Sequence, residues 1–457
     1  MPDASDSSQS VTLREFARFP ECGILAISLV LFLWFLDANW ATRLFDENHY
    51  ADLAALVWDH GPLFRTDLHA QRTYLYPMLL SLIWPIAGSD PVIFKVVVAL
   101  TQYGVLVGTV ALLASRVSGG ARGRRAVLAA GLWNPYWVQS STLLLTDSLA
   151  VCGFVVAVSN AWRGDLNRWW GVASSVGLAA CVGMLRPAAL PALGLVFAVA
   201  LVRIGFRRDL NGWRFAGRCL VGLLPLAPQL LLNLRNFGVW SILPELPMYR
   251  IQLTWAVHRL RWVTSTDSSH DGGVVYANPV AVGADQTLLS ALFDAPLAFA
   301  IAYGSHLFHL LDWGYVDIFV GDLYAPSRLA GSAFVYTTWG LVLLGMVEQL
   351  RRRRAGEAVG ADWLVLALAS CSYGLFIATT QMETRYAYPV LMLVLPLCGP
   401  GVDGLARFAA PRSGRLPALR ILSAGLAYVA LVVSLWAMSL TLDLTTDRVD
   451  WFTYYLG

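Results

Sequence analysis

Long apolar runs alternate with short polar segments along most of the chain. Each run predicts a membrane-spanning helix, because a helix of about 20 apolar residues crosses the hydrocarbon of a bilayer. The candidate spans are roughly 22–39, 91–114, 126–142, 146–162, 169–185, 187–204, 215–233, 329–350, 363–380, 386–401 and 421–441. The pattern therefore predicts an all-α polytopic membrane protein with about eleven transmembrane helices.

Two of the apolar stretches predict sharp turns at the membrane surface. Residues 126–162 and 169–204 are each too long for one span and have about the right length for two. The first stretch is expected to turn near Asp147 and the second at Arg186-Pro187. Both turns then present charged side chains to the same compartment.

The arginines orient these helices, because positively charged residues prefer short cytoplasmic loops. Arginine-rich hinges occur at 116–125, 163–168, 203–214, 351–354 and 407–420. With 1–20 as a cytoplasmic tail, all five hinges lie inside only if the proline-containing segment 74–88 does not cross. We therefore expect a transmembrane domain over 21–442, outer loops at 40–90 (with juxtamembrane helices) and 234–328, an outer-face helix at 288–311, and an outer tail at 443–457.

The composition supports this class of protein and adds little about its chemistry. Hydrophobic residues make up 57% of the chain and charged residues 14%, whereas the net charge is only +3. Lys95 is the single lysine among many arginines, a coding bias that favours a GC-rich bacterium and hence its inner membrane. The six cysteines form no CxxC pair and are read as packing residues. No nucleic-acid partner is expected.

Seven charged residues outside the hinges are expected to gather on the opposite side of the membrane. They are Asp46, Glu47, Asp147, Arg186, Arg235, Glu383 and Arg385. Ionisable groups are costly near hydrocarbon, so their convergence favours a reaction site over packing. A simpler reading exists for FDENHYADLAALVW (45–58), where acidic residues in the first turn stabilise a helix dipole. That reading does not explain Asp147.

Several segments together resemble the GT-C superfamily of integral membrane glycosyltransferases, in particular aminoarabinose transferases and protein O-mannosyltransferase relatives. The stretch D-E-x-x-Y-A, from Asp46 to Ala51, resembles the first-loop signature of that superfamily. The other matching segments are NPYWVQSSTLLLTDSLAV (134–151), LRPAAL (185–190), LRNFG (234–238) and METRYAYPV (382–390). One departure concerns the Lys-Pro-Pro element of aminoarabinose transferases, whose place is taken by QRTYLYP (71–77) with Arg72 as the candidate cation.

The resemblance implies sugar transfer from a polyprenyl-phosphate donor to a glycan, glycolipid or protein hydroxyl at the periplasmic membrane face. The candidate catalytic residues are Asp46, Asp147 and Glu47. Asp46 matches the proposed catalytic base and Asp147 the second-loop acid. Glu47 and Asp46 point about 100° apart on a helix, so only one of them should face the acceptor. Donor phosphate and lipid candidates are Arg72, Arg235, Arg385, Arg186, Tyr74 and Tyr388, and substrate candidates are Tyr50, His49 and Glu383.

Alternatives remain open at this stage. Each arginine could instead form a buried ion pair, and Arg385 in particular could pair with Glu383 or Asp147. A divalent metal ion between Asp46 and Asp147, or at His306, His309 and Asp312, is a further candidate. A lipid-linked glycan polymerase or ligase, and a transporter or flippase, are the competing function classes.

Overall fold

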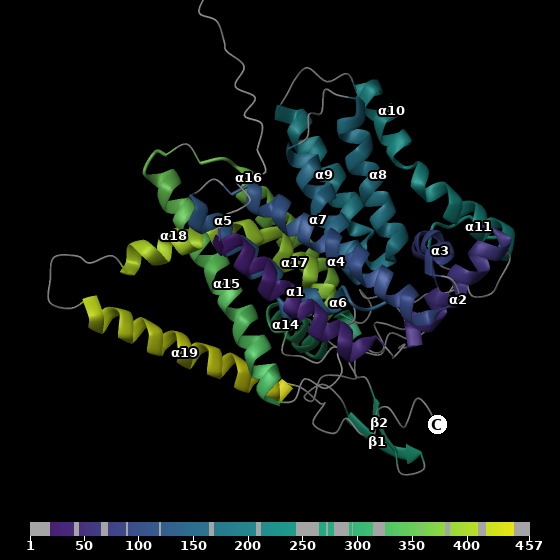
Figure 1. Cartoon of the computed structure of the whole chain (residues 1–457). Coiled ribbons are helices and arrows are strands. Elements are labelled where there is room, and N and C mark those ends of the chain that lie inside the picture. Colours follow the sequence, from purple (N-terminus) through teal and green to yellow (C-terminus); the bar gives the residue numbers. More distant parts are fainter. Residues whose placement is uncertain are drawn as a thin grey trace, which may run out of the picture.

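The computed structural model describes residues 19–40, 45–64, 72–87, 90–117, 120–163, 169–206, 212–243, 265–270, 273–277, 292–294, 296–313, 325–357, 359–379, 384–409 and 417–442 (Figure 1). Most of these residues are helical. Glu383, one of the predicted substrate residues, lies outside them, as do the tails 1–18 and 443–457.

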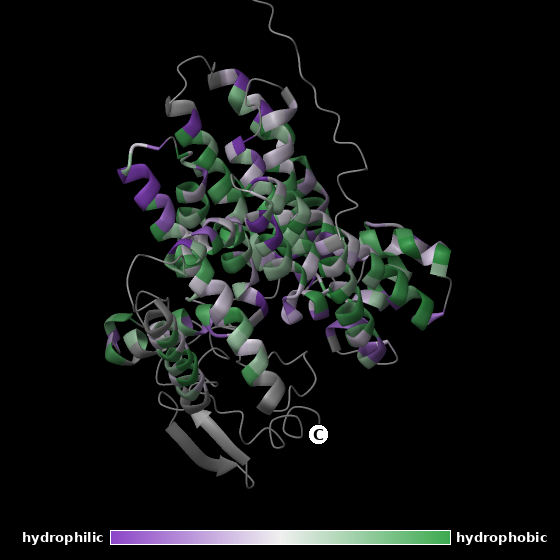
Figure 2. Cartoon of the chain, turned by 60° about the vertical axis from the view of Figure 1, so that its left-hand side comes forward, coloured by the Kyte–Doolittle hydropathy of each residue, from purple (hydrophilic) through white to green (hydrophobic). Residues whose placement is uncertain are grey.

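The helices follow the predicted apolar runs closely. Their bounds are α1 Phe19–Asn39, α2 Phe45–His60, α3 Leu75–Ala87, α4 Pro91–Ser115, α5 Ala121–Leu132, α6 Pro135–Ser140, α7 Asp147–Arg163, α8 Trp169–Leu185, η3 Pro187–Ala189, α9 Pro191–Phe206, α10 Gly212–Gly222, η4 Leu224–Leu226, α11 Ala227–Phe237, α14 Pro296–Leu311, α15 Ala325–Arg354, α16 Asp362–Ile377, α17 Thr384–Val394, η5 Leu395–Leu397, α18 Cys398–Ala409 and α19 Pro417–Leu442. Figure 2 shows hydrophobic residues along most of their length.

Six helical segments in the described part of the chain are long and apolar enough to cross a membrane. They are Pro20–Asn39, Pro91–Ser115, Trp213–Phe237, Leu329–Arg354, Thr384–Ala409 and Leu422–Ser439. The chain is therefore a multi-pass membrane protein that interacts with a lipid bilayer. The predicted short helix 74–88 appears as α3, and the predicted outer-face helix 288–311 appears over its second part as α14, which begins at Pro296.

The other five predicted spans are shorter or broken. Helices α7 and α8 have 17 residues each, and α9 and α16 have 16 each. The predicted span 126–142 is divided into α5 and α6 at Asn134-Pro135, where the Asn134 side chain accepts hydrogen bonds from the first turn of α6. A proline at the first helical position is favourable after such a cap, and it interrupts the preceding helix.

The all-α prediction holds for the helical bundle but not for the long loop 234–328. Two strands there, β1 (Ser265–His270) and β2 (Gly273–Ala277), pair antiparallel with Ser265 opposite Ala277. The two strands, STDSSH and GVVYA, have only 6 and 5 residues, so a search for apolar runs of transmembrane length carried no signal for the hairpin.

Helices α15 and α18 make a close contact that glycine permits. A Cβ atom on Gly401 would lie 2.0 Å from the Leu341 carbonyl oxygen, and one on Gly345 would lie 2.0 Å from the Leu397 carbonyl oxygen. Only glycine allows the two backbones to approach so closely. At one end of this pair Glu348 is buried and accepts hydrogen bonds from Arg351 at 3.0 Å and Arg352 at 2.8 Å. In contrast, α19 packs mainly on α15 and stands apart from the bundle (Figure 1).

Candidate active site

The first-loop carboxylate Asp46 pairs with the predicted cation of the same loop. Asp46 lies in the first turn of α2, and its Oδ1 accepts a hydrogen bond from Nη2 of Arg72, which precedes α3. The Asp46 side chain is 25% exposed, so it keeps access to solvent and to a ligand. The Arg72 guanidinium lies over the Tyr50 ring, 5.3 Å from its centroid. Asp46, Tyr50 and Arg72 therefore form one contact group.

The second carboxylate, Asp147, receives two arginines from separate parts of the chain. Its side chain is 2% exposed, and its Oδ1 pairs with Arg186. Nη1 of Arg385 lies 3.6 Å from Oδ2, which confirms one of the alternatives predicted for that arginine. The sequence explains the geometry locally, because Arg186 precedes Pro187 and takes the extended backbone that this position requires. Asp147 begins α7, where a carboxylate also favours the helix dipole.

Two tyrosines lie between these charged groups. The Arg186 guanidinium stacks on the Tyr386 ring at 4.4 Å, and Arg385 lies 5.7 Å from the same ring centroid. Burial raises the pKa of the Tyr50 hydroxyl, while the charges of Arg72, Asp46, Arg186 and Arg385 also act on it. The Asp46 group and the Asp147 group are linked geometrically, because Glu47, next to Asp46, accepts a hydrogen bond from the backbone N–H of Leu144, three residues before Asp147. We call Asp46, Tyr50, Arg72, Asp147, Arg186 and Arg385 together the carboxylate–arginine cluster.

Glu47 has a different position from its neighbour Asp46. Its side chain is fully buried and lies 3.2 Å from Nζ of Lys95 on α4, whose side chain is 1% exposed. Its Oε1 also accepts a 2.6 Å hydrogen bond from the backbone N–H of Leu144. Glu47 thus links the helix that carries Asp46 to the segment that leads into Asp147. The predicted divergence of Asp46 and Glu47 on the helix is observed, and the contacts of Glu47 are those of a positioning residue.

The segment 141–146 between α6 and α7 is irregular and buried, so its backbone groups need partners inside the protein. Gln102 donates to the Leu143 carbonyl oxygen at 2.7 Å, and Glu47 accepts from Leu144 as described. Lys95 and Gln102 are seven residues apart on α4, which places them on one face of that helix. This polar face of α4 therefore holds the segment that positions Asp147.

Tyr74 is tied to a neighbouring helix rather than directed at the cluster. Its backbone N–H donates to Gln229 Oε1 at 2.9 Å, and its hydroxyl donates to the Pro225 carbonyl oxygen at 2.7 Å. Burial raises the pKa of Tyr74 to about 12. These bonds fix the residues next to Arg72 against η4 and α11, so Tyr74 anchors the loop that carries the cation.

The remaining predicted residues make other contacts or lie at the surface. Arg235 is exposed and donates to the Leu63 carbonyl oxygen at 3.0 Å, beyond the far end of α2 and about 20 Å along that helix from Asp46. Tyr388 is 1% exposed and packs on Trp313 with ring centroids 5.0 Å apart. His49 lies on the exposed side of α2.

The predicted metal sites receive no support from the described residues. Within them no group of three or more His, Cys, Asp or Glu side chains is placed to hold a metal ion. Asp46 and Asp147 pair with arginines instead. His306 and His309 are buried, with His306 Nδ1 2.7 Å from the Ala378 carbonyl oxygen, and Asp312 accepts from the Tyr336 hydroxyl at 2.8 Å. Through these contacts His306 and Asp312 connect the α14 region to the end of α16 and to α15.

Sequence reasoning missed three residues that shape the cluster: Lys95, Gln102 and Tyr386. Lys95 carried a usable signal, because a single lysine inside an apolar run requires a buried partner. Tyr386 follows Arg385 directly, and aromatic rings next to arginines often stack with guanidinium groups. Gln102 carried no signal that distinguishes it from other polar residues in α4.

Comparisons of the chain with protein-family models, curated proteins and solved structures find no match. The chemistry of the cluster must therefore be read from its own residues. It combines an accessible carboxylate, a buried carboxylate and three guanidinium groups, which is an arrangement suited to a proton acceptor beside an anionic ligand.

Proposed function

We propose that the chain is an inverting glycosyltransferase that moves a sugar from a polyprenyl-phosphate-linked donor to a hydroxyl group of a glycan, glycolipid or protein. The resemblance of its loop segments to GT-C transferases motivates this proposal. The carboxylate–arginine cluster supports it independently, because it contains the groups that such a reaction needs.

The observation that carries the proposal is the gathering of three guanidinium groups around two carboxylates. Arg72 pairs with Asp46, whereas Arg186 and Arg385 both pair with Asp147. A phosphate group is a fitting ligand, since the planar fork of arginine binds two of its oxygens at once.

In the proposed reaction Asp46 is the base. Its carboxylate removes the proton of the acceptor hydroxyl as that oxygen attacks the anomeric carbon. The bond between the anomeric carbon and the phosphate oxygen breaks, and the phosphate carries away the bonding electrons. A single displacement inverts the anomeric centre. Asp46 is the better candidate for this role because it is 25% exposed, whereas Asp147 is 2% exposed and paired with two arginines.

The arginines stabilise the departing phosphate in this scheme. Arg72 is placed to exchange its Asp46 contact for a phosphate oxygen once that carboxylate takes up the proton. Arg186 and Arg385 are held by Asp147 and stacked near Tyr386, so they are oriented before the donor arrives. Preorganised charges of this kind act without reorganisation during the reaction.

For the membrane arrangement we propose about eleven crossings, with the N-terminus cytoplasmic and the cluster on the periplasmic side of a bacterial inner membrane. Six spans are long helices, and α5–α6, α7, α8, α9 and α16 supply the rest. A helix of 17 residues is about 25 Å long, so these shorter helices cross with the help of flanking residues. Accessibility of a cysteine placed at the exposed Asn48 position to an impermeant reagent checks the orientation, with Cys22 and Cys371 replaced beforehand because both are exposed.

Mass spectrometry of membrane lipids and envelope glycans tests the function. Cells with the wild-type chain should show a single-sugar increment that is absent from cells without the chain and from cells with the Asp46→Asn variant. The increment would identify sugar and acceptor together. An unchanged glycan and lipid profile in all three strains contradicts the proposal.

A further inference from the structure

A second site lies at the opposite end of the bundle from the carboxylate–arginine cluster. Lys95 and Arg116 lie near the two ends of α4, 21 residues and about 31 Å apart. Asp147 and Arg163 lie at the two ends of α7, about 24 Å apart. The Arg116 and Arg163 end is therefore separated from the cluster by most of the thickness of a bilayer.

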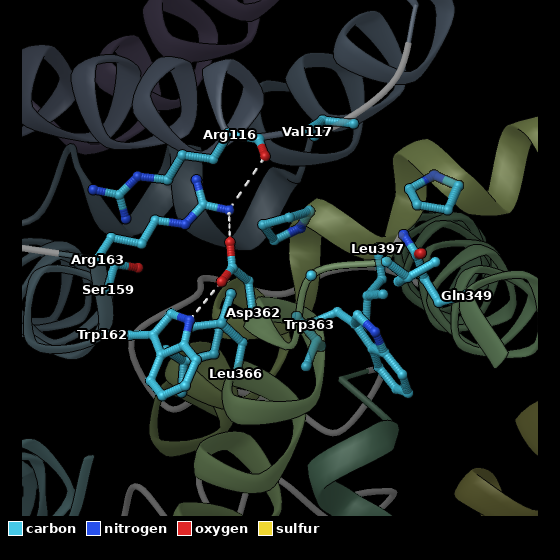
Figure 3. Close-up of a pocket in the computed structure, with 16 residues that line it drawn as sticks. Arg116, Val117, Ser159, Trp162, Arg163, Gln349, Asp362, Trp363, Leu366 and Leu397 are labelled. Carbon is cyan, nitrogen blue, oxygen red and sulfur yellow. Dashed lines mark hydrogen bonds and ion pairs between the residues drawn. The ribbon is translucent and has the colours of Figure 1, made fainter. Parts of the chain in front are cut away.

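This end of the bundle contains a cavity of about 140 Å³. Side chains from α7, α15, α16 and the α17–α18 region line it, together with Arg116 (Figure 3). Trp162, Trp363, Leu366 and Leu397 make its walls largely apolar, whereas Arg116, Ser159 and Gln349 supply polar groups. A cavity that holds one water needs only about 10–15 Å³ by the same measure, so this one accommodates a larger group.

Two residues that line the cavity carry donors without an acceptor among the described residues. Nη1 of Arg116 and Oγ of Ser159 are both buried without a hydrogen-bond partner. The Ser159 side chain belongs to a residue that is 2% exposed. Buried donors are costly when they are left unpaired, so both favour a ligand that brings acceptor oxygens.

Among the described residues around the cavity, Arg116 forms no salt bridge, because the nearby carboxylate of Asp362 pairs with Arg163. Arg163 pairs with Asp362, which also accepts a 2.5 Å hydrogen bond from Trp162 Nε1 (Figure 3). The other guanidinium nitrogen of Arg116, Nη2, donates to the neutral amide of Asn160 at 3.2 Å, and no described carboxylate lies within salt-bridge distance of it. Burial and, to a smaller extent, the neighbouring Arg163 lower the pKa of the Arg116 guanidinium, whereas the Asp362 carboxylate acts in the opposite direction.

We propose that this cavity binds the phosphate group of an anionic phospholipid, with Arg116 and Ser159 as donors to its oxygens. Tryptophans at helix ends mark the headgroup level of a bilayer, and Trp162 and Trp363 both line the cavity. At that depth the abundant anion is a lipid phosphate. Basic pockets between helices on the cytoplasmic side are the expected form of such a site, and the apolar walls suit the adjoining acyl chain.

The purified full-length chain tests this proposal by native mass spectrometry with phosphatidylglycerol. We expect Arg116→Gln and Ser159→Ala each to weaken phosphatidylglycerol binding about fivefold or more, the effect of losing one hydrogen bond to a charged group. Ser159→Ala removes only a hydroxyl group, so it reports on binding even if Arg116→Gln folds poorly. Arg124→Gln is the matched control, because Arg124 is exposed at the same end of the bundle.

Equal losses of phosphatidylglycerol binding in Arg116→Gln and Arg124→Gln would show diffuse charge attraction and overturn the proposal. Unchanged phosphatidylglycerol binding in Arg116→Gln and Ser159→Ala would overturn it as well. Competition by inorganic phosphate separates the two sources of the ligand. If millimolar phosphate leaves the lipid bound, the lipid headgroup is the ligand. If phosphate displaces the lipid and itself binds less tightly to both variants, the same donors serve a free phosphate ion.

Discussion

Glu47 and Lys95 form a buried ion pair at 3.2 Å that joins α2 to α4 at the base of the carboxylate–arginine cluster. Glu47 is the residue after Asp46, and it also accepts a hydrogen bond from the backbone N–H of Leu144 in the segment before Asp147. One contact set therefore determines the distance between the two carboxylates on which the proposed chemistry depends.

Replacing one partner of this pair should lower the free energy of unfolding far more than replacing both partners. Glu47→Gln or Lys95→Met leaves an unpaired buried charge and is expected to lower the free energy of unfolding by about 3–5 kcal/mol. The double variant should recover a large part of that loss. A double-mutant cycle of thermal unfolding in detergent measures the coupling, and additive single effects would mean that the pair makes no net contribution.

The pairing of Asp147 with two arginines predicts a specific pattern of activity losses. Asp147→Asn releases Arg186 and Arg385 from their common partner and is expected to reduce sugar transfer about 100-fold. Arg186→Lys keeps the charge but loses the fork and the stacking on Tyr386, so it should raise KM for the donor more than it lowers kcat. Steady-state kinetics with the donor varied give both values. A purely structural role would instead lower the amount of folded protein at unchanged KM.

The close contact between α15 and α18 predicts that Gly401→Ala destabilises the fold. The added Cβ would lie 2.0 Å from the Leu341 carbonyl oxygen, so the helices must separate, at a cost of about 1–3 kcal/mol or more. Gly425→Ala on α19 is the matched control, because nothing lies within 4 Å of the added atom. The control should leave the unfolding temperature equal or slightly higher. Similar effects of the two substitutions would contradict the observed contact.

The raised pKa of Tyr74 predicts how the free energy of unfolding changes at alkaline pH. Its folded pKa of about 12 lies above the value of about 10 in an unfolded chain, so the folded state favours the protonated hydroxyl. This contribution is complete below about pH 10 and is lost as the pH rises towards about 12. Tyr74→Phe should be less stable at neutral pH, because it loses the bond to Pro225, but should lose less further stability between about pH 9 and about pH 11. Unfolding temperatures of both proteins at the two pH values check this difference.

The sequence predicted the parts of this molecule that follow from hydrophobicity and charge. Helix positions followed from apolar runs. The turns expected near Asp147 and at Arg186-Pro187 placed both charged residues in one compartment, and a pairing of Arg385 with Asp147 was one of two alternatives that the sequence left open. Charges at such turns have few alternatives near hydrocarbon, which makes their grouping predictable.

Features that depend on tertiary contacts were not predictable in the same way. The Glu47–Lys95 pair joins residues 48 positions apart, and no local pattern indicates which acid a lone buried lysine contacts. Arg235 was expected near the donor phosphate, yet it bonds to Leu63 at the other end of α2, because its sequence position fixes only the side of the membrane. The break at Asn134-Pro135 was visible in the sequence, but the apolar run around it favoured a continuous span.

The central claim, that Asp46 is the proton acceptor of a sugar transfer, is tested most directly by the rate of transfer from a lipid-phosphate-linked sugar by the purified Asp46→Asn variant. Asp52→Asn is the matched control, since Asp52 is an exposed carboxylate on the same helix. The account predicts a loss of about 100-fold or more for Asp46→Asn and a nearly unchanged rate for Asp52→Asn. Wild-type rates for the Asp46→Asn variant, with the same folded fraction, would contradict it.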